Sequence, residues 1–203
     1  MILVGDYEGY SDINPSLYDN IRKEANTKVV GEGSRTDWKY FLYNRTILLD
    51  WIENILPAAS CDVIGQEHST LNYYNSLGED YRVSAGGRGG FNPYYFDIVT
   101  CWGIHYNKGE GIVKHNHFPY TFGFTYFVKA GENCSPFVVD GEEIETVEGR
   151  LVLFPGYIDH WANPGEGERT VIAGNVLYSD RGSLWYQSKD IKICFVMKKQ
   201  VLY

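Results

Sequence analysis

Between residues 97 and 178, short apolar runs follow one another and are separated by glycine, proline, asparagine and aspartate. Alternation of polar and apolar positions within such runs is typical of half-buried strands. We expect eight strands: Asp97–Tyr106, Ile112–Phe118, Thr121–Ala130, Pro136–Asp140, Glu143–Val147, Arg150–Phe154, Ile158–Ala162 and Arg169–Tyr178. Asp140-Gly141 suits a tight hairpin turn. The pattern predicts a mainly β fold, two antiparallel sheets wrapped as a cupin-like jelly roll, the double-stranded β-helix.

Before this region, apolar positions recur with helical spacing. Asn14-Pro15 has the character of an N-cap followed by proline at the first helical position, which predicts a short helix toward Lys28. A longer helix is expected from an N-cap at Thr36 to Pro57. Its apolar stripe consists of Trp38, Phe41, Leu42, Leu48, Leu49, Ile52, Ile55 and Leu56. A lone helix cannot bury such a stripe, so the N-terminal helices are expected to pack on the outside of a sheet.

The chain is expected to form one structural domain with three parts. Residues 1–96 form a helical or mixed extension that packs on the barrel, residues 97–178 form the catalytic core, and residues 179–203 form a tail. Ile191–Met197 is expected to add a strand on the outside. The glycine-rich residues 84–93 lack the spacing of a phosphate-binding loop and favour a linker, with a lid over the site as the alternative.

Composition and charge exclude several classes of protein. With 203 residues, of which 44% are hydrophobic, the chain is long enough to bury a core. Its formal net charge of -8, with no basic stripe, disfavours tight binding of nucleic acid. The sequence shows neither a signal peptide nor an apolar run that could span a membrane. Its four cysteines are scattered without a C-x-x-C pair, which favours reduced thiols and a cytoplasmic protein.

The strongest chemical pattern is His115-Asn116-His117, followed by His160 and Arg169. Side chains alternate along a strand, so His115 and His117 are expected on one side. With His160 from a strand across the barrel, they could hold one non-haem iron and leave positions open. Arg169 would then lie beside the metal as a cation for an anionic co-substrate. His115, His117 and His160 are therefore the predicted catalytic and metal-binding residues.

The same alternation predicts which neighbours face the cavity. Val113 is expected to point inward with the two histidines of its strand, and Ile158 and Ala162 with His160. Along the last strand, the inward positions after Arg169 are Val171, Ala173 and Asn175. These inward sets are mostly apolar or small apart from the proposed functional groups, as a ligand cavity in a barrel requires.

Three segments carry a resemblance to a known family. They are Tyr106-Asn-Lys-Gly109 before His115-Asn-His117, the run from Gly149 to His160, and Glu168-Arg169-Thr170. In order and spacing, these segments resemble the 2-oxoglutarate- and Fe(II)-dependent oxygenases, especially the small prolyl-hydroxylase-like members, many of them phage-encoded. The likeness covers roughly residues 97–178.

The resemblance implies a reaction and its cofactors. Fe(II), 2-oxoglutarate and O2 would react to give succinate, CO2 and an oxidised, in most cases hydroxylated, substrate. Arg169 would bind the far carboxylate of 2-oxoglutarate, with Tyr106 and Asn175 as further co-substrate contacts. The substrate itself, a protein side chain or a small molecule, is not indicated, and the acidic charge disfavours a nucleic acid.

One departure from the family pattern leaves alternatives open. Where the family has a carboxylate two residues after the first histidine, this chain has His117. His117 could be the third ligand; it could instead form hydrogen bonds while Asp140 or a water fills the place; or the fold could have lost its oxidation chemistry. Asp159 adjoins His160 but should face the other way.

Two other classes of protein compete with the oxygenase. A cupin would share the spacing from Gly109 to His115-x-His117, but the glutamate expected a few residues later is absent. A non-catalytic β-sandwich binding module would make use of the many tyrosines, including Tyr73-Tyr74 and Tyr94-Tyr95. His68 and His105 are expected to be structural.

Overall fold

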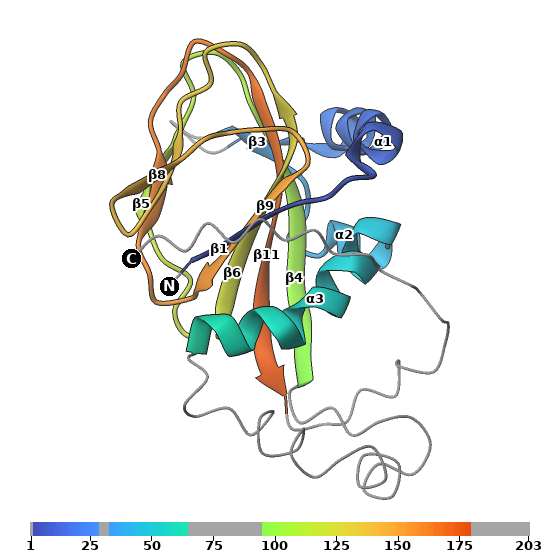
Figure 1. The fold of residues 1–203 in the computed structure, drawn as a ribbon. Helices are drawn as coiled ribbons and strands as arrows, with labels where there is room; N and C mark the ends of the chain where they lie inside the picture. The colour runs from blue at the N-terminus through green and yellow to red at the C-terminus, as the bar shows by residue number, and fades with distance from the viewer. Residues whose placement is uncertain (1, 29–32, 65–94, 180–203) are drawn as a thin grey trace, which may run out of the picture.

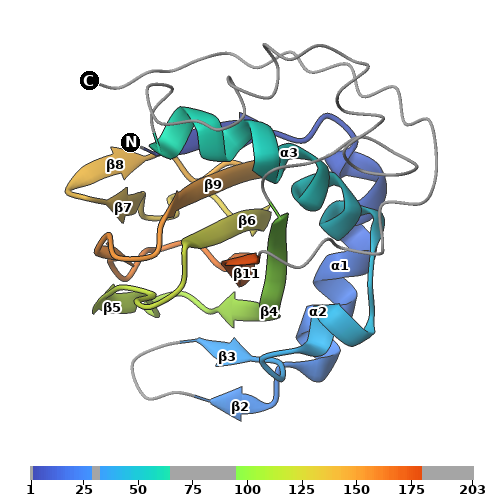
Figure 2. The ribbon, with the colours of Figure 1, turned by 90° about the horizontal axis from the view of Figure 1, so that it is seen from below.

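Two antiparallel sheets face each other in the computed structural model, which describes residues 2–28, 33–64 and 95–179 (Figures 1 and 2). The major sheet has the strand order β1-β9-β6-β11-β4-β3-β2 and the minor sheet β5-β10-β7-β8. Their bounds are β1 Leu3–Asp6, β2 Thr27–Lys28, β3 Ser34–Arg35, β4 Tyr95–Tyr106, β5 Ile112–His115, β6 Phe122–Ala130, β7 Phe137–Val139, β8 Glu142–Ile144, β9 Arg150–Pro155, β10 His160–Ala162 and β11 Arg169–Ser179. This is the predicted double-stranded β-helix.

The eight expected core strands are all present, with shorter bounds in the minor sheet. Asp140 and Gly141 both have positive φ, 53° and 82°, and join β7 to β8 with Val139 opposite Glu142. These are the angles of the tight hairpin turn that the sequence predicts. The expected strand at residues 191–197, the glycine-rich residues 84–93, and His68 lie outside the described residues.

Side chains alternate between the two faces of the major sheet, and each face contributes to a separate hydrophobic core. On β9, Val152 and Phe154 face the minor sheet, whereas Leu151 and Leu153 face the helices. The core between the sheets is made of Trp102, Ile104, Tyr106, Phe127, Phe137, Val139, Ile144, Val152, Phe154, Ile158, Ala162, Val171 and Ala173. A sheet that is buried on both faces is a rigid base for a site built on its inner side.

Three helices cover the outer face of the major sheet, as predicted (Figure 1). They are α1 (Tyr10–Glu24), α2 (Tyr40–Tyr43) and α3 (Ile47–Ile64). Leu17 and Ile21 of α1 and Ile52 of α3 pack with the outward side chains of β6 and β9. No helix among the described residues is long and apolar enough to cross a membrane.

The predicted start of the first helix is wrong. Helix α1 begins at Tyr10, ends at Glu24 and contains Pro15. Asn14 is buried: its Nδ2 donates to the carbonyl of Val128 at 2.8 Å, and its Oδ1 accepts from the Tyr126 hydroxyl at 2.8 Å. The Asn14 side chain therefore does not cap a helix; its hydrogen bonds join α1 to β6.

The long second helix is interrupted. It separates into α2 and α3 at residues 44–46, and α3 continues beyond Pro57 to Ile64. Thr36 is not an N-cap, because its hydroxyl donates to the carbonyl of Asp37 and accepts from the Gly103 amide. Trp38, expected on the buried stripe, is 46% exposed. Burial of the apolar face of α3 overrides the local preference of proline to end a helix.

The N-terminal part also contributes strands that the sequence reading did not define. β1 pairs with β9 at one edge of the major sheet, and the β2–β3 hairpin pairs with β4 at the other edge. These short additions cover edges that would otherwise expose unpaired backbone groups.

Asn14→Ala is expected to lower the free energy of unfolding by about 2 to 4 kcal/mol. The substitution leaves the buried Val128 carbonyl and Tyr126 hydroxyl without their partner, and each unsatisfied buried group costs roughly 1–3 kcal/mol. Urea unfolding would measure the change. Asn20→Ala, at an exposed position of the same helix, is the matched control and should have little effect. Equal stabilities of the two variants would contradict this role of Asn14.

Candidate metal centre

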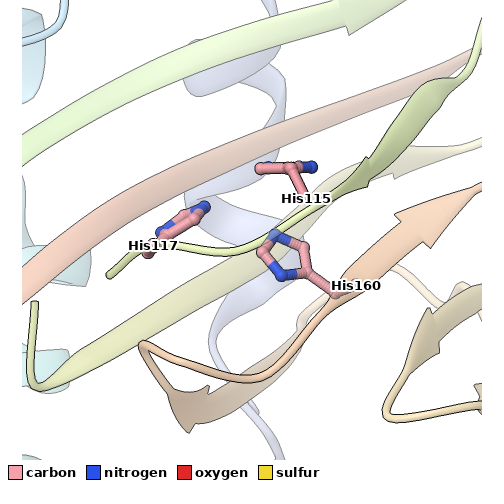
Figure 3. A group of neighbouring side chains, drawn as sticks. All are labelled: His115, His117 and His160. Atoms are coloured by element: carbon pink, nitrogen blue, oxygen red, sulfur yellow. The ribbon is translucent and has the colours of Figure 1, made fainter. Parts of the chain in front are cut away.

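Three histidines meet at the end of the minor sheet (Figure 3). His115 is the last residue of β5 and His160 the first of β10, and the two are direct partners across the strands. His117 lies just beyond β5. One ring nitrogen from each histidine lies within 4.8 Å of the others. The centroid of the His160 ring is 4.2 Å from that of His115 and 4.7 Å from that of His117.

A bulge in β5 sets the orientation of His115. Three residue steps on β5, from Ile112 to His115, lie opposite two steps on β10, from Ala162 to His160. Both Ile112 and His115 therefore line the cavity, although strict alternation would place them on opposite faces. Val113, predicted to face inward, is 66% exposed. That prediction is wrong because the extra residue changes the parity of the strand.

His117 is positioned by a loop rather than by a strand. Strand β5 ends at His115, whereas the sequence predicted it to continue to Phe118. The His117 amide donates to the carbonyl of Gly156 at 2.7 Å, and the carbonyl of His117 accepts from the Tyr120 amide at 2.9 Å. The loop is thereby joined to the chain segment after β9, and the His117 ring is brought to the other two histidines.

Backbone contacts leave the histidines suited to bind a cation. Nδ1 of His115 donates to the carbonyl of Val113 at 2.8 Å, and Nδ1 of His160 to that of Ile158 at 3.3 Å. Each Nε2 is then left with its lone pair, the arrangement that metal-binding histidines usually have. No carboxylate among the described residues joins the cluster. Three imidazole nitrogens suit Fe(II), and also Zn, Cu or Ni.

Burial keeps two of these rings uncharged. It lowers the pKa of His117 to about 4, and the nearby His115 contributes to the shift. Burial lowers the pKa of His160 to about 3, with His115 and His117 contributing. Both rings are therefore neutral at pH 7, which is the form that binds a metal.

The same shifts predict that acid destabilises the metal-free protein. In the unfolded chain these histidines take up protons near pH 6.5, whereas in the folded protein they stay neutral down to about pH 4 and pH 3. Stability is thus fully present above pH 6.5 and is lost as the pH falls, by up to about 2 kcal/mol per histidine at pH 5. Urea unfolding with a chelator at pH 7.5 and pH 5 would measure it. In the double variant His117→Gln/His160→Gln, the loss should be smaller; an unchanged loss would exclude these two residues as its source.

Arg169 lies in the same cavity as the histidines. The cavity holds about 410 Å³ counted to its open mouth, and its lining includes all three histidines, Tyr106, Arg169 and Trp102. Arg169 is 4% exposed, and burial lowers its pKa. Its guanidinium lies 4.7 Å from the centroid of the Tyr106 ring and, among the described residues, contacts the carbonyl and hydroxyl oxygens of Ser135 at 3.4 and 3.5 Å.

No carboxylate pairs with Arg169 in the part of the chain that the structure describes. Leaving a charge buried without a counterion is costly, so such sites are normally completed by a partner of opposite charge. A guanidinium offers parallel N–H donors that match a carboxylate. The cavity therefore combines three imidazole rings that could hold a metal ion with a buried guanidinium that could receive an anion.

The other predicted site residues lie at a distance from the metal cluster or behind it. Asn175 is buried and donates from Nδ2 to the Thr100 hydroxyl at 2.9 Å. Asp140 is exposed in the β7–β8 turn. Asp159 points away and pairs with Lys114 and Asn116. His105, expected to be structural, is buried and contacts Thr170 through Nδ1 at 2.8 Å.

Trp102 is one of several lining residues that the sequence analysis did not name. It is buried, borders the cavity, and its ring centroid is 6.2 Å from that of His117. Strand alternation carried the necessary signal: in Asp97–Tyr106, an inward Tyr106 places Ile104 and Trp102 on the same face. The inward positions predicted from the sequence covered only the strands that carry His115, His160 and Arg169, so Trp102 was not among them.

Solved structures of several hydroxylases have the same fold. A viral collagen prolyl hydroxylase from Paramecium bursaria Chlorella virus-1, in complex with 2-oxoglutarate, is 15% identical, with 89% of this chain and 96% of that chain covered and a TM-score of 0.53. A prolyl-4-hydroxylase from Pseudomonas putida is 17% identical, with 89% and 93% covered and a TM-score of 0.52. No protein-family model and no curated protein sequence matches this chain. At these identities, the likeness shows the fold.

Proposed function

We propose that this protein is a non-haem Fe(II)- and 2-oxoglutarate-dependent dioxygenase that oxidises, most simply by hydroxylation, a protein side chain or a small molecule. The observation that carries the proposal is the presence in one cavity of His115, His117, His160 and a buried Arg169 that has no carboxylate partner among the described residues. The shared fold with a hydroxylase solved with 2-oxoglutarate supports it.

The three histidines would hold the iron. Backbone carbonyls fix the ring orientation of His115 and His160, and burial keeps His117 and His160 unprotonated. When bound together with 2-oxoglutarate and O2, the iron would supply the oxidation of a C–H bond, coupled to conversion of 2-oxoglutarate to succinate and CO2. The three histidines would supply the protein's ligands to the iron, and the rest of the cavity would be available to the co-substrate.

Arg169 would bind the carboxylate of 2-oxoglutarate that is remote from the metal. Its guanidinium is held against Tyr106 at 4.7 Å and is buried, so a carboxylate bound there would be shielded from water and its interaction strengthened. Tyr106 fixes the plane of the guanidinium and thereby the direction of its donors.

The remaining lining excludes water. Phe127, Phe137, Val171 and Ala173 are buried around the histidines and Arg169. Such a lining favours binding of the carbon chain of a dicarboxylate between the two polar ends. It would also limit access of water to a metal held by the histidines.

An anaerobic optical titration tests this function. Metal-free protein would receive Fe(II) and then 2-oxoglutarate; a visible charge-transfer band that requires both additions is expected, because only a chelated 2-oxo acid on iron gives one. Succinate, which lacks the 2-oxo group, is the control and should give no band. Iron binding without the band would instead indicate a cupin-type metalloprotein, and absence of iron binding would favour a non-catalytic binding module.

A further inference from the structure

We propose that Asn175 and Thr100 position the His117 imidazole so that it can act as a metal ligand. A carboxylate at this position would not need that support. The proposal rests on the metal-binding part of the proposed function and not on the oxidation reaction. Asn175 is thereby given the role of a positioning residue behind a ligand, in place of the co-substrate contact that the sequence suggested.

Three residues form one row across the inner face of the major sheet. Asn175 of β11 is the direct partner of Gly123 on β6 and of Thr100 on β4. The Asn175 amide nitrogen donates to the Thr100 hydroxyl at 2.9 Å. Because Nδ2 is engaged by Thr100, the rotation of the amide is fixed, and its carbonyl oxygen Oδ1 is left as a free acceptor.

The His117 ring lies directly over this row. A Cβ placed on Gly123 would come within 2.8 Å of His117 Nδ1. Only glycine leaves room for the ring there, and the cross-strand partner of that glycine is Asn175. Nδ1 of His117 therefore lies next to the point on the inner face of the sheet where the Asn175 side chain begins.

Two buried polar atoms at this place have no partner at normal hydrogen-bond geometry among the described residues, and one can donate to the other. They are Nδ1 of His117 and Oδ1 of Asn175. A buried N–H that faces a buried carbonyl oxygen satisfies both groups after a small adjustment of the ring. Donation from Nδ1 to Oδ1 leaves the Nε2 lone pair for the metal, and also favours one ring orientation.

The contrast with the other two histidines shows why the support is needed. His115 and His160 each donate from Nδ1 to a backbone carbonyl two residues earlier. His117, which follows the end of β5, has no such carbonyl bond among the described residues. Its support comes from the facing sheet, through the side chains of Asn175 and Thr100.

Metal titration of matched variants tests the proposal, with Co(II) as the probe because its absorption spectrum reports ligand geometry. Asn175→Ala is expected to weaken Co(II) binding by about 10- to 100-fold, the usual cost of removing a group that supports a ligand, and to alter the spectrum. Asn175→Asp keeps an acceptor for Nδ1 and should retain binding close to wild type. Thr100→Val should weaken Co(II) binding, but less than Asn175→Ala does. Thr100→Ser keeps the hydroxyl and should leave Co(II) binding unchanged.

A second background separates positioning from general packing. His117→Asp replaces the imidazole by a ligand without an Nδ1 donor, so adding Asn175→Ala there should change Co(II) affinity by less than about 3-fold. An equal loss in both backgrounds, or wild-type affinity for Asn175→Ala, would overturn the proposal. If His117→Asp binds no Co(II), the difference between Asn175→Ala and Asn175→Asp decides. Failure of the wild-type protein to bind any metal would instead remove the proposed function itself.

Discussion

His160→Ala is expected to abolish stoichiometric binding of Fe(II), with an affinity loss greater than about 100-fold. Groups that merely support a ligand already cost 10- to 100-fold when removed, and His160 is the ring closest to both of the others. It also carries the contact between β10 and β5, since it is the direct partner of His115. Anaerobic equilibrium dialysis or calorimetry with Fe(II) would measure the loss.

His105→Ala is the matched control for His160→Ala. His105 is also buried, at 2% exposure compared with 3%, but it belongs to β4 and contacts Thr170 outside the metal cluster. Its removal should lower stability and leave Fe(II) affinity unchanged. Loss of metal binding in both variants would indicate unfolding rather than loss of a ligand, and retained binding in His160→Ala would rule out the three-histidine centre.

Arg169→Met is expected to have two effects of opposite sign. Affinity for 2-oxoglutarate should fall by about 100-fold, because the substitution removes two charge-assisted hydrogen bonds, each worth roughly 1.5–3 kcal/mol. Solvation of the carboxylate offsets part of that loss. The ligand-free protein should become more stable, by about 1 kcal/mol or more, because a buried cation for which the described residues offer no carboxylate is replaced by an apolar side chain of similar length. Titration of the charge-transfer band and urea unfolding would measure the two effects.

Arg150→Met provides the comparison for Arg169→Met. Arg150 forms ion pairs with Asp6 and Glu145 near the surface, so its loss should reduce stability slightly and leave 2-oxoglutarate affinity unchanged. A ligand-free Arg169→Met protein less stable than wild type would show that Arg169 has a partner in the resting protein. Unchanged 2-oxoglutarate affinity would exclude it as the anchor.

The fold could be predicted from the sequence where the periodicity was long and regular. Eight core strands and a helical layer on the outside follow from alternation and from the apolar stripe. The helix boundaries did not follow, because Asn14 and Thr36 have side chains that suit caps but form tertiary hydrogen bonds instead. Local preference cannot show which distant group a polar side chain will meet.

The sequence predicted which functional side chains share one cavity, but not the geometry that brings them together. His115, His117, His160 and Arg169 do line one cavity. The reason given for the first two, a common strand face, was incomplete: a bulge orients His115 and a loop orients His117. Bulges and strand ends are determined by pairing with another strand, which the residues of one segment do not reveal. The exposed Val113 is the visible consequence of that bulge.

The two ends of the proposed co-substrate site belong to different sheets, since β5 and β10, which carry His115 and His160, lie in the minor sheet and Arg169 in the major one. A ligand that contacts both ends must match the distance between the two sheets. The spacing of the sheets would therefore select ligands by the length of their carbon chain. Phe137 of the minor sheet, in ring contact with Phe127 and Phe154 of the major sheet at 6.0 and 6.1 Å, holds the sheets at that distance. Discrimination between dicarboxylates that differ by one methylene would then depend on Phe127, Phe137 and Phe154, none of which needs to recognise a polar group.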